Sequence, residues 1–193
     1  LSNYTIMQSH NGDGWGVDDN HCCGFEYVLN LSGTLAPGEV YVIVKLGDTT
    51  DGILLGAADL ELLYIENCMD LINYIGISSC GSSFSNCDTE TTPSNDGFSK
   101  VVAHNGDDAL GLFKNCNIEC ELIDVIGDAN DDPGSGWGWE VAGINNATIN
   151  NTLVRKETIS EGNIDWNSSR GTNADNSEWI VKAEDDFDYI GCF

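Results

Sequence analysis

Residues 110–126 read LGLFKNCNIECELIDVI and contain two short apolar runs, Leu110–Phe113 and Leu122–Ile126, with a turn between them. Both runs are brief and rich in residues that favour strands, so they predict two neighbouring strands. Cys116 and Cys120 lie on either side of the turn, and their spacing makes a disulfide across it plausible. The segment therefore predicts two strands joined by a cross-linked turn.

Similar short runs recur along the chain. The segment Ala36-Pro37-Gly38 predicts a turn that leads into one of them, because proline presets its own φ and glycine tolerates the next conformation. Only Ile53–Leu63 has the pattern of a helix, and it is short. Strands this brief, bounded by Gly, Asn and Asp, predict an all-β antiparallel sandwich or barrel. The further predicted strands are Glu39–Val44, Leu71–Ile75, Thr152–Val154 and Trp179–Val181.

Length and charge restrict the class of protein. The 193 residues, 41% of them hydrophobic, are enough for one compact domain with a core. With 32 Asp and Glu against 7 Lys and Arg, the formal net charge is −25. Nucleic acid and anionic membrane surfaces are therefore poor partners, and no apolar run is long enough for membrane insertion. The start at Leu1, without a signal peptide, suggests a processed segment.

The cysteines point to an oxidising compartment. Zinc sites usually present close cysteine pairs together with a second pair or histidines, a spacing that this chain lacks, so disulfides are the favoured interpretation and metal ligation the alternative. The stretch between Cys80 and Lys100 is rich in Ser, Thr and Asn, which predicts an exposed loop. Cys80 and Cys87 are expected to hold part of it in place. The eight cysteines are Cys22, Cys23, Cys68, Cys80, Cys87, Cys116, Cys120 and Cys192.

Five N-x-S/T sequons agree with a secreted or extracellular location and predict N-linked glycans. The chain is rich in Asn, Ser and Thr, so chance occurrence is the alternative. The candidate acceptors are Asn3, Asn30, Asn146, Asn150 and Asn167.

Two acidic loops have the oxygen density that calcium prefers, so calcium is the one cofactor to be considered. Neither loop has the EF-hand spacing, and a solvated turn rich in Asp and Asn is the simpler interpretation. The candidate ligands are Asp13, Asp18 and Asp19 in the first loop and Asp128 and Asp131 in the second.

Two further groups of side chains are candidates for binding. Trp137 and Trp139 flank Gly138 in a glycine-rich loop and are candidates for a surface contact, with core packing as the alternative. Asp107 and Asp108 follow the turn signal Asn105-Gly106, where a binding role competes with a purely structural one. No nucleophile, metalloprotease, phosphate-binding or dinucleotide motif is found, so we expect no enzymatic activity.

The second half of the chain resembles a known family. In order and spacing, a series of segments is similar to the lamin tail domain in the form found in secreted and cell-surface proteins. The resemblance covers residues 1–60 and 101–193, and it implies one immunoglobulin-like β-sandwich domain over 1–193 with an insertion at 61–100. The segments are Asn105–Leu112, Ile123–Gly127, Asp132–Trp137, Thr152–Lys156, Gly162–Trp166, Ser177–Val181 and Phe187–Gly191.

One departure from the family suggests a function. Members usually have one or two strands before the segment that Leu1–Ile6 matches, and these strands are missing here. A sandwich without them would expose an edge that an upstream segment, the insertion or a neighbouring subunit must cover. We therefore expect a non-enzymatic subunit of a filament or surface appendage that self-associates by strand donation. The alternative is a calcium-, glycan- or protein-binding module of a larger secreted protein.

Overall fold

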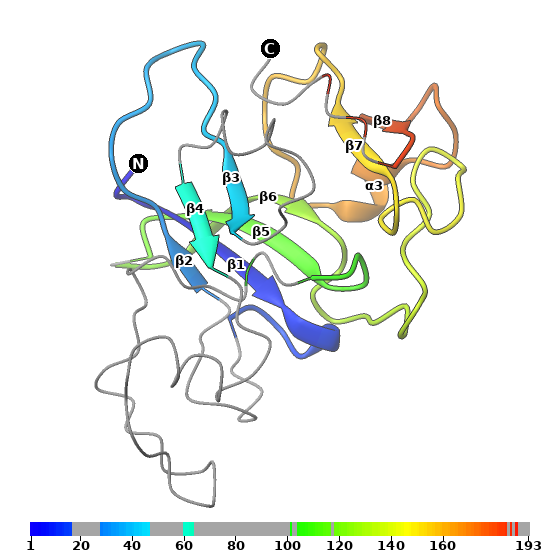
Figure 1. The fold of residues 1–193 in the computed structure, drawn as a ribbon, viewed down its shortest axis with the longest axis horizontal. Helices are drawn as coiled ribbons and strands as arrows, with labels where there is room; N and C mark the ends of the chain where they lie inside the picture. The colour runs from blue at the N-terminus through cyan, green and yellow to red at the C-terminus, as the bar shows by residue number, and fades with distance from the viewer. Residues whose placement is uncertain are drawn as a thin grey trace, which may run out of the picture.

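The structure is a computed structural model. It describes residues 1–16, 28–46, 60–63, 101, 104–116, 118–184, 186 and 188, and for 44–46 and 60–63 it describes the backbone alone. In this part of the chain, strands predominate and helix is scarce (Figure 1). The elements in chain order are β1 (Tyr4–Ser9), the 3-10 helix η1 (His10–Gly12), β2 (Val28–Asn30), β3 (Ile43–Leu46), β4 (Leu60–Leu63), β5 (Ala109–Lys114), β6 (Glu121–Ile126), β7 (Thr152–Arg155), α3 (Trp166–Arg170) and β8 (Trp179–Lys182).

The centre of the molecule is a four-stranded antiparallel sheet in the order β2-β1-β5-β6. β5 and β6 form the hairpin that the sequence predicts, with a register shift between Leu112 and Phe113. β1 pairs along its whole length with β5, from Tyr4 opposite Lys114 to Ser9 opposite Ala109. This long-range pairing brings the first residues of the chain into the middle of the sheet.

Two smaller sheets accompany the central one. β7 and β8 form an antiparallel pair, which agrees with both strands predicted there. β3 and β4 form a parallel pair, with Ile43 opposite Leu60, so the expectation of purely antiparallel sheets is wrong for this pair. Figure 1 shows β3 and β4 in front of the central sheet, and β7, β8 and α3 together at the upper right. The all-β class is therefore confirmed.

Each face of the central sheet has its own hydrophobic core. Residues directly opposite one another on antiparallel strands share a face, and side chains alternate along each strand. Ala109 and Val125 belong to one core, which α3, β7 and β8 complete. Ile6 and Leu112 belong to the other, to which Tyr41 and Ile43 contribute. A sheet covered on both sides positions its edges and its turns for contact with solvent.

Several predicted boundaries need correction. The predicted helix Ile53–Leu63 is wrong at its end, because Leu60–Leu63 is strand β4. Pairing with β3 outweighs the local preference there. The short helix of the described chain is instead α3, where the Asp165 carboxylate accepts a hydrogen bond from Ser168 N.

Four further predictions concern the region from Ala36 to Lys100. The strand expected at Glu39–Val44 starts later, at Ile43. The turn before it is confirmed, with Glu39 N donating to Ala36 O over 3.0 Å. The strand expected at Leu71–Ile75 and most of the insertion expected at 61–100 lie outside the described residues.

Candidate functional site

The β1–β2 end of the central sheet is the candidate functional site, and its hydrogen-bond pattern follows from one contact. Leu31 N donates to Tyr4 O over 3.0 Å, so these opposite residues form a hydrogen-bonded pair. Because such pairs alternate along antiparallel strands, Leu29 and Ile6 form the next one. The backbone groups of Val28 and Asn30 therefore point away from β1, toward the side of β2 where no described strand pairs.

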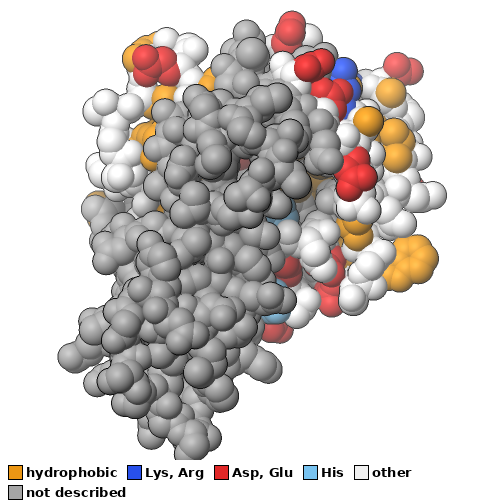
Figure 2. All heavy atoms as spheres, viewed as in Figure 1, with side chains coloured by type: hydrophobic (Ala, Val, Ile, Leu, Met, Phe, Trp, Pro, Cys, Tyr) orange, Lys and Arg blue, Asp and Glu red, His pale blue; other side chains and the backbone are white. Residues whose placement is uncertain are grey.

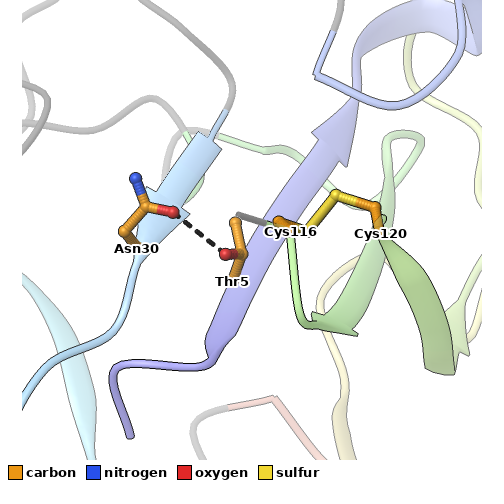
Figure 3. The surroundings of a disulfide bond; sticks show 4 residues. All are labelled: Thr5, Asn30, Cys116 and Cys120. Carbon is orange, nitrogen blue, oxygen red and sulfur yellow. Dashed lines mark hydrogen bonds between the residues drawn. A yellow bond between two sulfur atoms is a disulfide. The ribbon is translucent and has the colours of Figure 1, made fainter. Parts of the chain in front are cut away.

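Thr5 and Asn30 lie opposite each other at this end, in a pair without backbone hydrogen bonds. Side chains approach most closely at such pairs. The Thr5 hydroxyl donates to Asn30 Oδ1 over 2.9 Å (Figure 3). Thr5 is only 3% exposed, so this bond satisfies a buried hydroxyl. In Figure 3 the Asn30 nitrogen points away from Thr5.

A hollow of about 350 Å³ lies beside this pair and is lined by Ser2, Asn3, Thr5, Asn30 and Cys116. Cys116 is disulfide-bonded to Cys120, as the sequence predicts. Asn115 N donates to Asn3 O over 2.7 Å, which ties the start of the cross-linked turn to the residue before β1. The hollow is thus bordered by two strands and by a turn that the disulfide closes.

The two edge strands of the central sheet differ in their cover. β6 is approached by Gly162, where an added Cβ would lie 2.1 Å from Ile123 O. Asn163 N also donates to the Asp124 carboxylate over 2.9 Å on this strand. No described residue forms a strand with the outer side of β2. Among the described strands of this sheet, β2 is therefore the open edge.

In the acidic turn before β5, which contains Asp107 and Asp108, the Asp108 carboxylate contacts other side chains of the fold. Asp108 is 6% exposed, accepts from Gln8 Nε2 over 2.8 Å and lies 3.2 Å from His10 Nδ1. Burial raises the pKa of Asp107, the nearby Asp108 charge raises it further, and a hydrogen bond from Asn105 opposes the rise. A purely structural role, without a bound ligand, therefore accounts for the observed contacts of Asp108.

A second polar cluster, which the sequence did not reveal, joins β6, β7 and β8 around Arg155. Its Nη1 lies 3.1 Å from both Asp124 oxygens, and its Nη2 donates to Glu178 Oε2 over 2.6 Å. Asn163 Nδ2 donates to Glu178 Oε1 over 2.8 Å. Arg155 and Lys156 are adjacent basic residues in the sequence, but the acidic partners of Arg155 come from distant segments. We define Arg155, Asp124, Glu178 and Asn163 as the arginine cluster.

The calcium candidates are only partly within the described chain. Asp13 is exposed, and Asp128 and Asp131 lie in a loop that packs against the turn after β1, where Gly14 N donates to Ala129 O over 3.1 Å. Among the described residues, no three acidic, histidine or cysteine side chains are grouped so that they could hold a metal ion. Asp18 and Asp19 lie outside the described residues.

The two candidate tryptophans have different environments. Trp137 is 61% exposed, whereas Trp139 is 9% exposed and belongs to the core next to Trp166. The ring centroids of Trp139 and Trp166 are 6.3 Å apart in an edge-to-face arrangement. Only Trp137 is therefore positioned for a surface contact; the alternative of core packing is the correct one for Trp139.

The sequons also differ in their surroundings. Asn3, Asn30, Asn150 and Asn167 are exposed, whereas Asn146 is half-buried. Asn146 and Asn150 have positive φ values of 56° and 53°. The remaining predicted disulfide cysteines, Cys22, Cys23, Cys68, Cys80, Cys87 and Cys192, lie outside the described residues.

Acidic, polar and hydrophobic side chains all occur on the described part of the face in Figure 2. Figure 2 shows acidic side chains scattered over the coloured part of this face, with basic side chains gathered in a small group at the upper right. Hydrophobic side chains lie along its right-hand border. None of the helices in the described part of the chain has the length and apolar character that a bilayer crossing needs.

Comparison with known proteins gives no match: no family model, no curated protein and no solved structure is significantly similar to the chain.

Proposed function

We propose that the chain is a non-enzymatic extracellular structural glycoprotein with an immunoglobulin-like sandwich of the lamin-tail type. In this proposal it is a subunit of a filament or surface appendage, and neighbouring subunits join by strand addition at β2. The supporting observation is that the backbone groups of Val28 and Asn30 point away from β1, where no described strand pairs with them. An extended segment of a second copy can supply partners for these groups.

The two edges of the sheet favour β2 over β6 as the joint. Gly162 and Asn163 already lie along β6, so an incoming strand would have to displace them. At β2, addition needs no such rearrangement among the described residues. The acidic charge of the chain is the opposing effect, because subunits of net charge −25 repel one another. We therefore expect assembly to strengthen as added salt screens this repulsion.

Electron microscopy and sedimentation velocity of the purified chain over a range of concentrations and salt test this proposal. We expect fibres or larger species that become more abundant as either rises. Val28→Pro removes an outward-facing N–H and should abolish assembly while the melting temperature stays close to that of the wild type. Leu29→Pro is the matched control, because it removes an N–H that bonds to β1 and should lower the melting temperature. A folded wild-type chain that remains monomeric under all these conditions contradicts the proposal.

A binding module is the second candidate, and the exposure of Trp137 supports it. The residue follows Gly134 and Gly136, both with positive φ, in a loop that presents the indole to solvent. Exposed indole faces stack on apolar faces of sugars and on cations. Fluorescence titration with soluble oligosaccharides tests this function. A response that Trp137→Ala abolishes would support it, and the absence of any response would contradict it.

A further inference from the structure

We infer that Asn30 carries an N-linked oligosaccharide that the Thr5 hydroxyl orients, and that Asn146 does not carry one although its sequon is equally complete. The inference deepens the proposed function, since it rests on the chain being a secreted glycoprotein. It concerns how the fold distinguishes among sequons that look alike in the sequence.

At Asn30 the described residues leave the side-chain nitrogen, to which a glycan would be attached, without a hydrogen bond. Asn30 Oδ1 accepts the hydrogen bond from Thr5, and in the described chain Asn30 Nδ2 has no hydrogen-bond partner. The nitrogen points away from the partner strand (Figure 3), and Asn30 is exposed. A sugar attached to Nδ2 leaves Oδ1 unchanged, so the bond to Thr5 persists and restricts the rotation of the linkage. Side chains stand roughly perpendicular to the sheet, whereas the outward backbone groups of Asn30 lie in its plane.

Thr5 has two roles in this arrangement. It is the hydroxyl residue of the sequon that begins at Asn3. Its hydroxyl also donates a hydrogen bond to Asn30, the asparagine of the second sequon. The hollow beside it is open to solvent, and Ser2, Asn3 and Asn30 contribute polar side chains to it, which gives room for a sugar next to either asparagine. Thr5 is therefore a positioning residue for the glycan at Asn30.

At Asn146 each part of the sequon takes part in the fold. Asn146 is half-buried, and its Oδ1 accepts from Gly138 N over 3.2 Å. Ala147 is fully buried, and its N–H donates to Trp139 O over 2.9 Å. The Thr148 hydroxyl donates to Gly106 O over 2.6 Å and accepts from Trp139 N over 3.0 Å.

The positive φ at Asn146 gives an independent reason for asparagine at this position, because asparagine tolerates the left-handed region better than most residues. N-linked glycans are added before folding is complete, and one attached here would oppose the packing around Trp139. We therefore expect molecules that fold and leave the cell to lack it.

The test is glycopeptide mapping of the wild-type chain secreted from a eukaryotic cell line behind an added signal peptide. Enzymatic release of the glycans in heavy-oxygen water marks each occupied Asn by its conversion to Asp. We expect Asn30 to be occupied in most secreted molecules and Asn146 in few. An unmodified Asn30, or an Asn146 occupied as fully as Asn30, overturns the inference.

The role of Thr5 needs a background in which the first sequon is already absent. We compare Asn3→Gln, which keeps the hydroxyl, with Asn3→Gln/Thr5→Val, which removes it, and with Asn3→Gln/Thr5→Ser, which restores it. In the Thr5→Val protein, an endoglycosidase should release the Asn30 glycan from the native protein roughly fivefold faster, as the loss of one ordinary hydrogen bond implies. Equal rates in all three proteins overturn the positioning role. Because the host adds the glycans irrespective of assembly, dispersed particles with a glycan on Asn30 would reject only the proposed filament.

Discussion

The guanidinium carbon of Arg155 lies 4.6 Å from the centre of the Trp179 ring, over the face of the indole. The same side chain bridges Asp124 on β6 and Glu178 just before β8. Trp179 is 7% exposed and belongs to the core, and its Nε1 donates to Ser169 Oγ over 2.8 Å. The arginine cluster therefore connects the central sheet, the β7–β8 pair and α3 through one residue. The contacts of Arg155 with Asp124, Glu178 and the Trp179 ring all use its guanidinium.

Replacing Arg155 with Met should lower the free energy of unfolding by about 2 kcal/mol, because Asp124 and Glu178 would be left half-buried without a cation. Chemical denaturation monitored by tryptophan fluorescence measures the change. Lys114→Met is the matched control: its pair with Glu121, at 3.3 Å, is largely exposed and should contribute less than about 1 kcal/mol. Equal losses for the two variants would contradict a special role for the cluster.

Glu178 makes the stability of the fold depend on pH in the acidic range. Burial alone would raise its pKa, but hydrogen bonds from Asn163 and Ser169 and the Arg155 charge outweigh it and hold the pKa below its ordinary value of 4.5. A lowered pKa in the folded state stabilises the fold above pH 4.5, and this contribution is lost as the pH falls through the folded-state pKa. The melting temperatures of the wild type and of Glu178→Gln should therefore differ most near neutrality and converge in acid. A constant difference at every pH would argue against this linkage.

Asp107 should have the opposite effect. Its raised pKa means that the folded state disfavours the ionised carboxylate, so stability declines as the pH rises from 3.8 through the folded-state pKa. Asp107→Asn removes this titration while keeping an oxygen that can accept from Asn105. We expect the variant to gain stability relative to the wild type across that pH range, as measured by thermal unfolding. If the stability of the variant relative to the wild type fell as the pH rises, the folded state would favour the ionised carboxylate of Asp107.

Gly106 lies where the backbone leaves no room for a side chain. Its φ is +102°, and an added Cβ would lie 2.2 Å from the Thr148 carbonyl oxygen. Gly106→Ala should therefore cost roughly 3 kcal/mol or prevent folding, since both strain and a backbone clash must be relieved. Gly134→Ala is the control: its φ is +90° but nothing lies within 4 Å of the added atom, so we expect about 1 kcal/mol from backbone strain alone.

The disulfide Cys116–Cys120 closes a short loop, and its main effect is to restrict the unfolded chain. Cys116→Ser/Cys120→Ser should lower the free energy of unfolding by about 2 kcal/mol. The hairpin of β5 and β6 should persist, because its pairing extends well beyond the turn. Chemical denaturation of the oxidised proteins measures the loss. Unchanged stability would contradict this effect of the disulfide on the unfolded chain.

Local pattern was a reliable guide where neighbours in sequence are also neighbours in space. The runs Leu110–Phe113 and Leu122–Ile126 became β5 and β6, because a short turn brings their apolar side chains together. The runs Thr152–Val154 and Trp179–Val181 became β7 and β8 for their strand-favouring composition. The β2 strand and the parallel partnership of β3 with β4 were not predicted, since long-range pairing decides them. The location of α3 was not predicted either, although the Asp165 cap at its start is a local feature.

The amino-acid sequence by itself determined the all-β class, the hairpin with its disulfide and the acidic charge, because alternation, cysteine spacing and composition are local properties. Only the tertiary structure decided which residues meet across long separations in the chain. It placed Thr5 against Asn30, gathered Asp124, Arg155 and Glu178 into one cluster, and buried Trp139 while leaving Trp137 in solvent. These outcomes depend on strand register and on competition for a limited interior, which no single segment specifies.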